Sequence, residues 1–296
     1  MTDAATLRDP QEQGAKPPFP EQEQNLPGLE QEMDPRPDYG VESYKGSGKL
    51  QGRRALITGG DSGIGRAVAL AFAREGADVA ISYLPQEEAD AAETAQIVEA
   101  EGRKCLRLPG DIQDQGKCRE LVERTVGELG GLDILVNNAA FQDTHPEFTE
   151  ISAEELEKTF RTNFHAMFWL CQAAVPHMKP GASILNTTSV QAYKPKSHLI
   201  HYASTKAAIR AFTQALAQEL AEKGIRVNGV APGPIWTPLI PASFPGEKVK
   251  EFGKQTPLGR AGQPKEVAPV FVFLASDDAS YVTGQIYGVT GGEPTA

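Results

Sequence analysis

The sequence predicts an α/β protein in which helices cover both faces of a parallel β-sheet. From residue 50 onward, short apolar strand patterns alternate with Ala- and Glu-rich helical patterns, which is typical of repeated βα units. Hydrophobic residues form 40% of the 296 residues, enough to fill a globular core. The length allows one large domain over residues 49–296, preceded by an N-terminal extension over residues 1–48.

The expected elements follow one another as strand and helix along the domain. Strands are expected at residues 53–58, 78–83, 104–108, 132–136, 182–187, 225–230 and 285–289. Helices are expected at residues 64–74, 86–101, 114–128, 153–177, 202–220 and 264–275. Gly102 is expected to end the second helix, because glycine readily adopts the conformation that closes helices.

The extension over residues 1–48 is rich in Pro, Gln and Glu and poor in apolar residues, so it cannot bury a core of its own. Two alternatives remain: the extension is disordered, or it lies extended over a neighbour's surface. The apolar anchors that favour the second alternative are Phe19, Leu26, Leu29, Met33, Tyr39 and Tyr44. The sequence of the extension indicates no chemistry.

Charge and composition exclude several classes of function. A net charge of -10 argues against nucleic acid or an anionic membrane as the partner. We expect no transmembrane helix and no signal peptide, because no apolar run approaches the required length. Cys105, Cys118 and Cys171 are scattered, which is typical of reduced thiols in the cytoplasm. The five histidines form neither HxxxH nor HExxH, so no metal site is expected.

A glycine-rich turn follows the first strand and opens the first helix. It comprises residues 58–65, with the sequence TGGDSGIG. Glycines let the backbone approach a pyrophosphate closely, and the free N–H groups of a helix N-terminus attract the negative charge. The turn therefore indicates dinucleotide binding, although its spacing departs from GxGxxG. The alternative is a flexible loop without a ligand.

Tyr202 and Lys206 form a second candidate site. They lie four residues apart on a predicted helix and therefore share one face of it. A free tyrosine titrates near pH 10, but a close cation favours the phenolate and would lower this pKa. We expect the pair to exchange a proton with an alcohol or a carbonyl. Taken alone, Tyr-x-x-x-Lys also fits a solvated helical face.

Several motifs recur here in the order and spacing of the classical short-chain dehydrogenases/reductases, which this chain resembles over about residues 50–294. They are the glycine turn, Asn137-Asn138-Ala139-Ala140, Asn163, Ser189, Tyr202-x-x-x-Lys206 and Pro232-Gly233. The extension and residues 40–65 are similar to the bacterial glucose/ribitol-dehydrogenase-like, general-stress oxidoreductases. The resemblance implies a single Rossmann-type, doubly wound parallel sheet of about seven strands, NAD or NADP as the cofactor, and a homotetramer.

The resemblance also implies a role for particular residues. The residues implied to bind the cofactor are Gly59, Asp61, Ser62, Gly63, Ile64, Gly65, Tyr83, Asp111, Ile112, Asn138, Ala139, Ala140, Tyr202, Lys206, Pro232, Gly233, Ile235 and Thr237. Tyr202 would be the general acid/base, Lys206 would lower its pKa, and Ser189 would hydrogen-bond the substrate oxygen. Asn163 would hold a water that links Lys206 to solvent, or alternatively would only cap or kink a helix.

Two features bear on the choice of cofactor. Asp111 follows the third strand, where the family places an acid against the adenine amino group; the alternative is a helix cap. The second strand ends in residues 82–85, Ser-Tyr-Leu-Pro, and no acid follows before Glu87. A carboxylate there would hold the ribose of NAD and repel the 2′-phosphate of NADP. No Arg or Lys stands there to bind a 2′-phosphate, and Arg66 is the nearest cation in the sequence. The missing acid favours NADP and leaves NAD open.

The resemblance implies an oxidoreductase that transfers a hydride between nicotinamide and the CH–OH or C=O group of a small alcohol, polyol, sugar or aldehyde. Residues 234–259 are Pro-rich and are expected to form a substrate lid. The expected substrate pocket consists of Phe141, Gln142, Gln191 and Tyr193. The alternatives are a catalytically silent, dinucleotide-binding redox sensor and a stress-related scaffold that binds partners through the extension.

Overall fold

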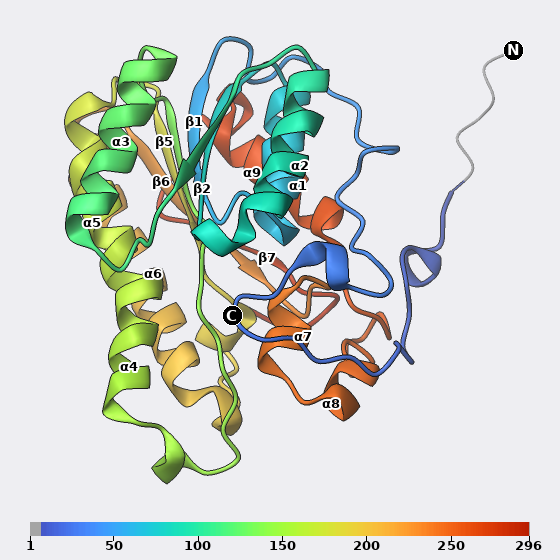
Figure 1. The fold of residues 1–296 in the computed structure, drawn as a ribbon. Helices are drawn as coiled ribbons and strands as arrows, with labels where there is room; N and C mark the ends of the chain where they lie inside the picture. Colours follow the sequence, from blue (N-terminus) through green and yellow to red (C-terminus); the bar gives the residue numbers. More distant parts are fainter. Residues whose placement is uncertain (1–6, 296) are drawn as a thin grey trace, which may run out of the picture.

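A seven-stranded parallel sheet forms the centre of the protein (Figure 1). The computed structural model describes residues 7–295. The strands are β1 (Arg54–Thr58), β2 (Asp78–Tyr83), β3 (Cys105–Pro109), β4 (Ile134–Asn137), β5 (Ser183–Thr187), β6 (Arg226–Pro232) and β7 (Ile286–Val289). They lie in the order β3-β2-β1-β4-β5-β6-β7, and all neighbouring pairs are parallel. The doubly wound parallel sheet expected from the sequence is confirmed.

Helices cover both faces of this sheet (Figure 1). One face carries α1 (Gly63–Arg74), α2 (Glu88–Ala100) and α9 (Pro264–Ala275). The other carries α3 (Gln115–Leu129), α5 (Ala166–Ala174) and α6 (Ile200–Ala221). Successive side chains of a strand point to opposite faces, so Ile57 packs in the core under α1 and Leu56 in the core under α5. Both are fully buried, which explains why β1 reads as a continuous apolar run.

The strand order reverses between β1 and β4. Because the connections from these two neighbouring strands run in opposite directions, their carboxyl ends leave a crevice in which such sheets bind ligands. The two strand ends are tied together there, since the backbone N–H of Asn138 donates to Oγ1 of Thr58 at 2.9 Å. The topology therefore places the glycine turn and the segment after β4 at one site.

The segment expected as one helix over residues 153–177 contains a π-helical turn. α4 (Ala153–Phe160) passes into this turn at Arg161–His165, and α5 then continues to a short 3₁₀ turn at Val175–His177. Asn163 lies in the π turn, and its side chain makes two hydrogen bonds to the backbone of Phe141, at 2.7 Å and 2.9 Å. Such turns are frequent at functional sites, and apolar periodicity gives no sign of them.

The described part of the extension, residues 7–48, lies extended across the domain with short 3₁₀ turns at Pro10–Glu12 and Glu30–Glu32 (Figure 1). The extension thus lies over its own domain, whereas the sequence left open disorder or the surface of a neighbour. The extension pairs with the two short helices of the expected lid, α7 (Leu239–Ser243) and α8 (Gly246–Lys250). The backbone N–H of Phe19 donates to the carbonyl of Lys250 at 2.9 Å, and that of Gln24 to the carbonyl of Pro241 at 2.8 Å.

Phe19 and Trp236 form the centre of an apolar cluster beneath the extension. Their rings stack with centroids 4.0 Å apart and an interplanar angle of 8°. Trp236 is fully buried, and its Nε1 donates to the carbonyl of Pro35 at 2.8 Å. A buried indole needs such a partner, so the extension supplies both the apolar contact and the hydrogen bond that Trp236 requires.

The remaining sequence expectations concern membranes and thiols. Within residues 7–295, every helix is too short or too polar to cross a bilayer. Cys105, Cys118 and Cys171 are free thiols. Burial raises the pKa of each thiol to about 12, so they are poor nucleophiles.

Replacing Phe19 by alanine should destabilise the protein by about 3 kcal/mol, because it removes the ring that covers Trp236. The free energy of unfolding is measured by chemical denaturation with Trp fluorescence as the probe. Leu7→Ala in the same extension is the control, since Leu7 is 98% exposed. Equal midpoints for Phe19→Ala and Leu7→Ala would show that the extension does not stabilise the domain.

Candidate active site

The glycine turn has a backbone that only glycine can adopt. Gly59 and Gly63 have φ angles of 60° and 51°, in the left-handed region. A Cβ on Gly65 would lie 1.8 Å from the carbonyl oxygen of Gly59, so α1 packs directly on the turn. Nδ2 of Asn138 donates to the carbonyls of Thr58 and Gly59, each at 3.1 Å. The turn is therefore held by the segment after β4 and is not a flexible loop.

A cavity of about 970 Å³ runs from this turn across the carboxyl ends of the strands to the lid. Every residue expected to bind the cofactor lines this cavity except Gly65. Gly65 instead lies where α1 packs against the backbone of Gly59. Of the residues expected to be catalytic, Ser189, Tyr202 and Lys206 line the cavity. The tertiary structure thus brings together residues from seven separate segments of the sequence. The volume is of the size that cofactor and ligand sites usually have.

Lys206 lies at the bottom of this cavity and is 2% exposed. Its Nζ donates to the carbonyl of Thr187 at 2.9 Å and lies 5.4 Å from the centre of the Tyr202 ring. Both residues belong to α6, as their four-residue spacing predicted. Ser189 begins a 3₁₀ turn, and its hydroxyl accepts a hydrogen bond from the N–H of Gln191 at 3.1 Å.

Burial shifts the pKa of both groups on α6 in the direction that favours the uncharged form. It raises the pKa of Tyr202 to about 12, with a smaller lowering from a hydrogen bond to Ser189. It lowers the pKa of Lys206 to about 7, and no carboxylate offsets this burial. The expectation that Lys206 lowers the pKa of Tyr202 is therefore wrong for the protein alone. Loss of water is the largest cause of both shifts, and Lys206 directs its amine to the carbonyl of Thr187.

Asn163 lies outside the large cavity and borders a second one of about 10 Å³. This volume is close to that of one water probe, and polar side chains of Thr58, Asn137 and Thr187 also border it. Nδ2 of Asn163 donates to Oγ1 of Thr205 at 3.1 Å. Because Thr187 is also the acceptor for Lys206, the small cavity lies next to the amine.

Asp111 lines the cavity and does not cap a helix. Its Oδ1 accepts from the N–H of Gln113 at 2.9 Å, in a local turn. The cap of α3 is Asp114, whose Oδ1 accepts from the N–H of Lys117 at 2.7 Å. The structure thus removes the helix-cap alternative for Asp111. Its role toward adenine stays a prediction.

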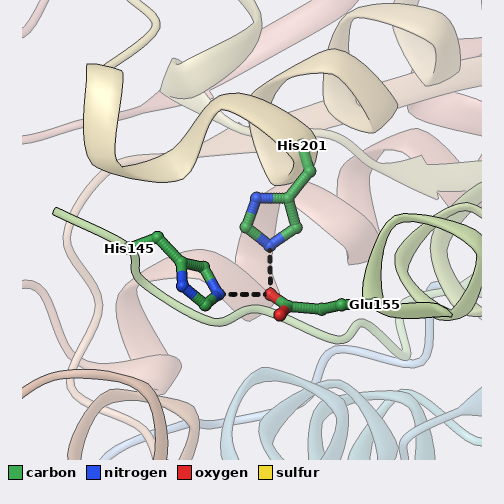
Figure 2. A group of neighbouring side chains, drawn as sticks. All are labelled: His145, Glu155 and His201. Carbon is green, nitrogen blue, oxygen red and sulfur yellow. Dashed lines mark hydrogen bonds and ion pairs between the residues drawn. The ribbon is translucent and has the colours of Figure 1, made fainter. Parts of the chain in front are cut away.

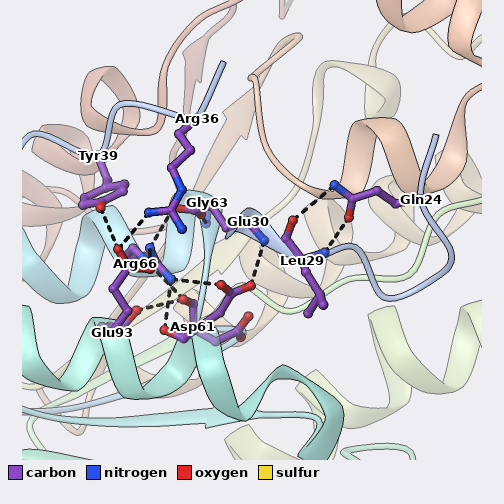
Figure 3. Close-up of polar contacts among 11 residues, drawn as sticks. Gln24, Leu29, Glu30, Arg36, Tyr39, Asp61, Gly63, Arg66 and Glu93 are labelled. Atoms are coloured by element: carbon purple, nitrogen blue, oxygen red, sulfur yellow. Dashed lines mark hydrogen bonds and ion pairs between the residues drawn. The ribbon is translucent and has the colours of Figure 1, made fainter. Parts of the chain in front are cut away.

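Arg66, the nearest cation to the glycine turn in the sequence, does not reach the cavity. Its guanidinium is fully buried and pairs with Glu30 at 2.9 Å and with Glu93 at 3.1 Å (Figure 3). At the end of β2, the hydroxyl of Tyr83 donates to Glu88 at 2.6 Å. Glu87 also lines the cavity, and burial raises the pKa of its carboxyl, which favours the neutral form. A neutral carboxyl does not repel a phosphate.

Glu30 of the extension contacts the glycine turn, a contact that the sequence did not indicate. Its Oε2 accepts from the N–H of Gly63, the first residue of α1, at 2.6 Å (Figure 3). Its own N–H donates to Oδ2 of Asp90 at 2.7 Å, and its side chain is fully buried. The carboxylate thus occupies one of the free N–H groups at the positive end of the helix. Burial raises the pKa of Glu30 to about 7.

This fold, with a glycine turn at the first strand and a helix opening on it, defines a dinucleotide-binding α/β protein. A family model described as enoyl-(acyl carrier protein) reductase matches residues 59–293. The chain belongs to the short-chain dehydrogenase/reductase family of oxidoreductases, as its motifs predicted.

Relatives and solved structures agree with this assignment. General stress protein 39 of Bacillus subtilis (strain 168) is 56% identical over 266 residues, covering 90% of this chain and 93% of that protein. NADPH-dependent aldehyde reductase 1, chloroplastic, of Arabidopsis thaliana is 52% identical over 272 residues, covering 90% and 94%. A short chain dehydrogenase from Burkholderia cenocepacia J2315 in complex with NADP has a TM-score of 0.77 and 33% identity, covering 83% of this chain and 99% of that chain. The resemblance to the general-stress oxidoreductases is confirmed.

Replacing Glu30 by alanine should lower the free energy of unfolding by about 2 kcal/mol, because it removes a buried partner of Arg66. It should also weaken NADPH binding, since the N–H of Gly63 loses its acceptor and the turn loses its link to the extension. Chemical denaturation and fluorescence titration with NADPH measure the two effects. Glu32→Ala is the matched control, because Glu32 is exposed in the same short turn. If the two variants behave alike, Glu30 does not anchor the turn.

The stability of the protein should rise with pH above 7 through Lys206. The pKa of this amine is about 7 in the folded protein against an ordinary value of 10.5. Between these values the unfolded chain holds a proton that the folded protein has lost, so raising the pH favours folding. We expect the wild type to gain stability relative to Lys206→Met as the pH rises from about 7 to about 9. Denaturation curves at several pH values measure this difference; a constant difference would contradict the lowered pKa.

Proposed function

We propose that this protein is an NAD(P)-dependent oxidoreductase that transfers a hydride between nicotinamide and the CH–OH or C=O group of a small alcohol, polyol, sugar or aldehyde. One observation carries the proposal: a single cavity joins the glycine turn to Ser189, Tyr202 and Lys206. A pyrophosphate-binding turn and a proton-transfer pair in one cavity are the two parts that such a reaction needs.

The residues of the cavity fit a dinucleotide. The glycine turn would hold the pyrophosphate against the N-terminus of α1, and Asp111 and Ile112 would lie at the adenine. The segments after β4 and β6, with Asn138 and Pro232, would hold the nicotinamide half. When bound, the nicotinamide supplies or accepts the hydride.

NADP is the cofactor we favour. The cavity beside Tyr83 carries no free carboxylate from β2, and burial favours the neutral form of Glu87. The Burkholderia cenocepacia structure contains NADP, and the Arabidopsis thaliana relative is named as NADPH-dependent. Arg66 does not contribute to the choice of cofactor, because its guanidinium forms ion pairs with Glu30 and Glu93.

The side chains on α6 and at the end of β5 would move the proton. Tyr202 would give its hydroxyl proton to the carbonyl oxygen during reduction, and would take the proton back during oxidation. Ser189 would donate a hydrogen bond to the same oxygen and so stabilise its developing charge. Lys206 would hold the nicotinamide ribose and return protons to Tyr202. Asn163 would hold a water beside Thr187 that connects Lys206 to solvent.

The substrate end of the cavity is mixed in polarity, which supports a small polar substrate. Phe141, Gln142 and Gln191 line it, together with α7 and α8 of the lid. Tyr193 lies outside, since its ring packs under the guanidinium of Arg210 at 4.5 Å. The name of the Arabidopsis thaliana relative, an aldehyde reductase, supports aldehydes as one substrate class.

Assembly into a homotetramer and a cytoplasmic location complete the proposal. Three large apolar side chains are exposed on α4, α5 and α6, and subunit association would bury them. They are Leu156, Phe168 and Ile200. The free thiols favour a reducing compartment.

A substrate-by-cofactor activity matrix tests this proposal. Purified protein is assayed with polyols, sugars and aldehydes against NAD⁺, NADP⁺, NADH and NADPH, following the absorbance of the reduced nicotinamide. We expect turnover with at least one small carbonyl compound and NADPH. Stoichiometric NADPH binding without turnover on any of these classes would instead favour the catalytically silent redox sensor.

Replacing Tyr202 by phenylalanine should lower kcat by about 100-fold or more, because the carbonyl oxygen loses its proton donor. NADPH binding should stay within about twofold of wild type, since the ring remains in place. Tyr281→Phe is the control, because Tyr281 is fully exposed. Near-normal kcat in Tyr202→Phe would exclude this tyrosine as the acid/base.

A further inference from the structure

His145, Glu155 and His201 come together from three separate segments beside the substrate end of the cavity (Figure 2). His145 lies in the segment after β4, Glu155 in the first turn of α4, and His201 near the start of α6. Their distance in the sequence conceals the group from any motif search. His145 lines the cavity, and His201 directly precedes Tyr202.

The three side chains converge on one point. Nε2 of His145 lies 2.7 Å and Nε2 of His201 lies 3.1 Å from the same oxygen, Oε1 of Glu155. All three atoms lie within 4.8 Å of one another. Figure 2 shows both rings directing Nε2 at that oxygen from different sides.

His201 is not satisfied by this arrangement. It is 1% exposed, and neither of its ring nitrogens makes a hydrogen bond within residues 7–295. Its Nε2 is close enough to Oε1 of Glu155 for an ion pair, but the two atoms are not aligned as donor and acceptor. A buried polar group without a partner lowers the stability of the folded protein, so we expect this nitrogen to bind a further partner at the point where the three side chains converge.

Two imidazole nitrogens and one carboxylate oxygen are a ligand set for zinc. Zinc binds histidine nitrogen at about 2.0–2.1 Å and carboxylate oxygen at about 2.0–2.2 Å, so the ligand atoms of a tetrahedral site lie about 3.4 Å apart. The separations to Glu155, 2.7 Å and 3.1 Å, require only small side-chain movements to reach that geometry. Three protein ligands leave a position open for water or a substrate oxygen.

We propose that His145, Glu155 and His201 form a site for a divalent transition-metal ion, Zn²⁺, with one coordination position left open. The ion would join the segment after β4 to the start of α6, one residue before Tyr202. It would therefore fix the wall of the substrate pocket next to the proposed proton donor. The site is independent of the dinucleotide, and its metal binding is measurable without any turnover.

Zn²⁺ titration of the EDTA-treated full-length protein, in competition with a chromophoric chelator, tests this site. We expect one equivalent of tightly bound Zn²⁺. His145→Gln and Glu155→Gln should each weaken Zn²⁺ binding by about 10- to 100-fold or more. Loss of a residue that only supports a metal ligand already costs this much. Both side chains are partly exposed, at 20% and 18%, so these changes should leave the fold intact, which circular dichroism checks.

His198→Gln is the matched control. His198 lines the same cavity on the preceding turn, but its ring packs on Phe244 and has no carboxylate partner. It should keep wild-type affinity for Zn²⁺. X-ray absorption spectroscopy of the zinc-loaded wild type tests the site without any variant. We expect nitrogen and oxygen neighbours at about 2.0–2.2 Å from the zinc. No stoichiometric binding, an equal loss in His198→Gln, or a shell of oxygen alone would overturn the proposal.

Discussion

The close packing of the glycine turn against the segment after β4 is the constraint on which the site depends. The backbone at Gly65 lies so near Gly59 that any side chain would collide with its carbonyl oxygen. Nδ2 of Asn138 donates to that same carbonyl and to the carbonyl of Thr58, so neither strand end can move without breaking these partly buried hydrogen bonds. This packing leaves the N-terminus of α1 facing the crevice between β1 and β4, where a dinucleotide-binding protein needs it.

The second governing factor is the exclusion of water around α6. Lys206 is buried with one carbonyl acceptor and no carboxylate, so the folded protein carries an amine that gives up its proton near neutral pH. Tyr202, buried beside it, keeps its proton more firmly than in water. Both shifts have one cause, the cost of a charge in a medium of low polarity. A site of this kind responds strongly to any ligand that brings hydrogen bonds or charge.

The extension makes a third contribution, because it completes surfaces that the domain alone would leave unsatisfied. Its Glu30 binds both the first N–H of α1 and the guanidinium of Arg66, while Phe19 and Pro35 cover Trp236 in the lid segment. One strand of chain therefore contacts the cofactor turn and the lid together. A buried charge such as Arg66 is tolerated only with partners of this kind.

Local sequence patterns were sufficient for much of this protein. The apolar strands and the helices between them predicted the parallel sheet, because their periodicities reflect burial on one or two faces. The glycines between the first strand and the first helix predicted the turn at residues 58–65, and the spacing of Tyr202 and Lys206 predicted a shared helix face. The family motifs identified many residues of the cavity: of the expected cofactor-binding and catalytic residues, only Gly65 and Asn163 do not line it.

Tertiary structure alone decided the features that depend on residues far apart in the chain. The π turn at Asn163, the pairing of Arg66 with Glu30, and the meeting of His145 with His201 leave no periodic trace in the sequence. The sequence also could not predict that the pKa of Tyr202 is raised. Spacing along a helix reports that a cation is near, but only the packing of the whole domain sets how much water each group loses.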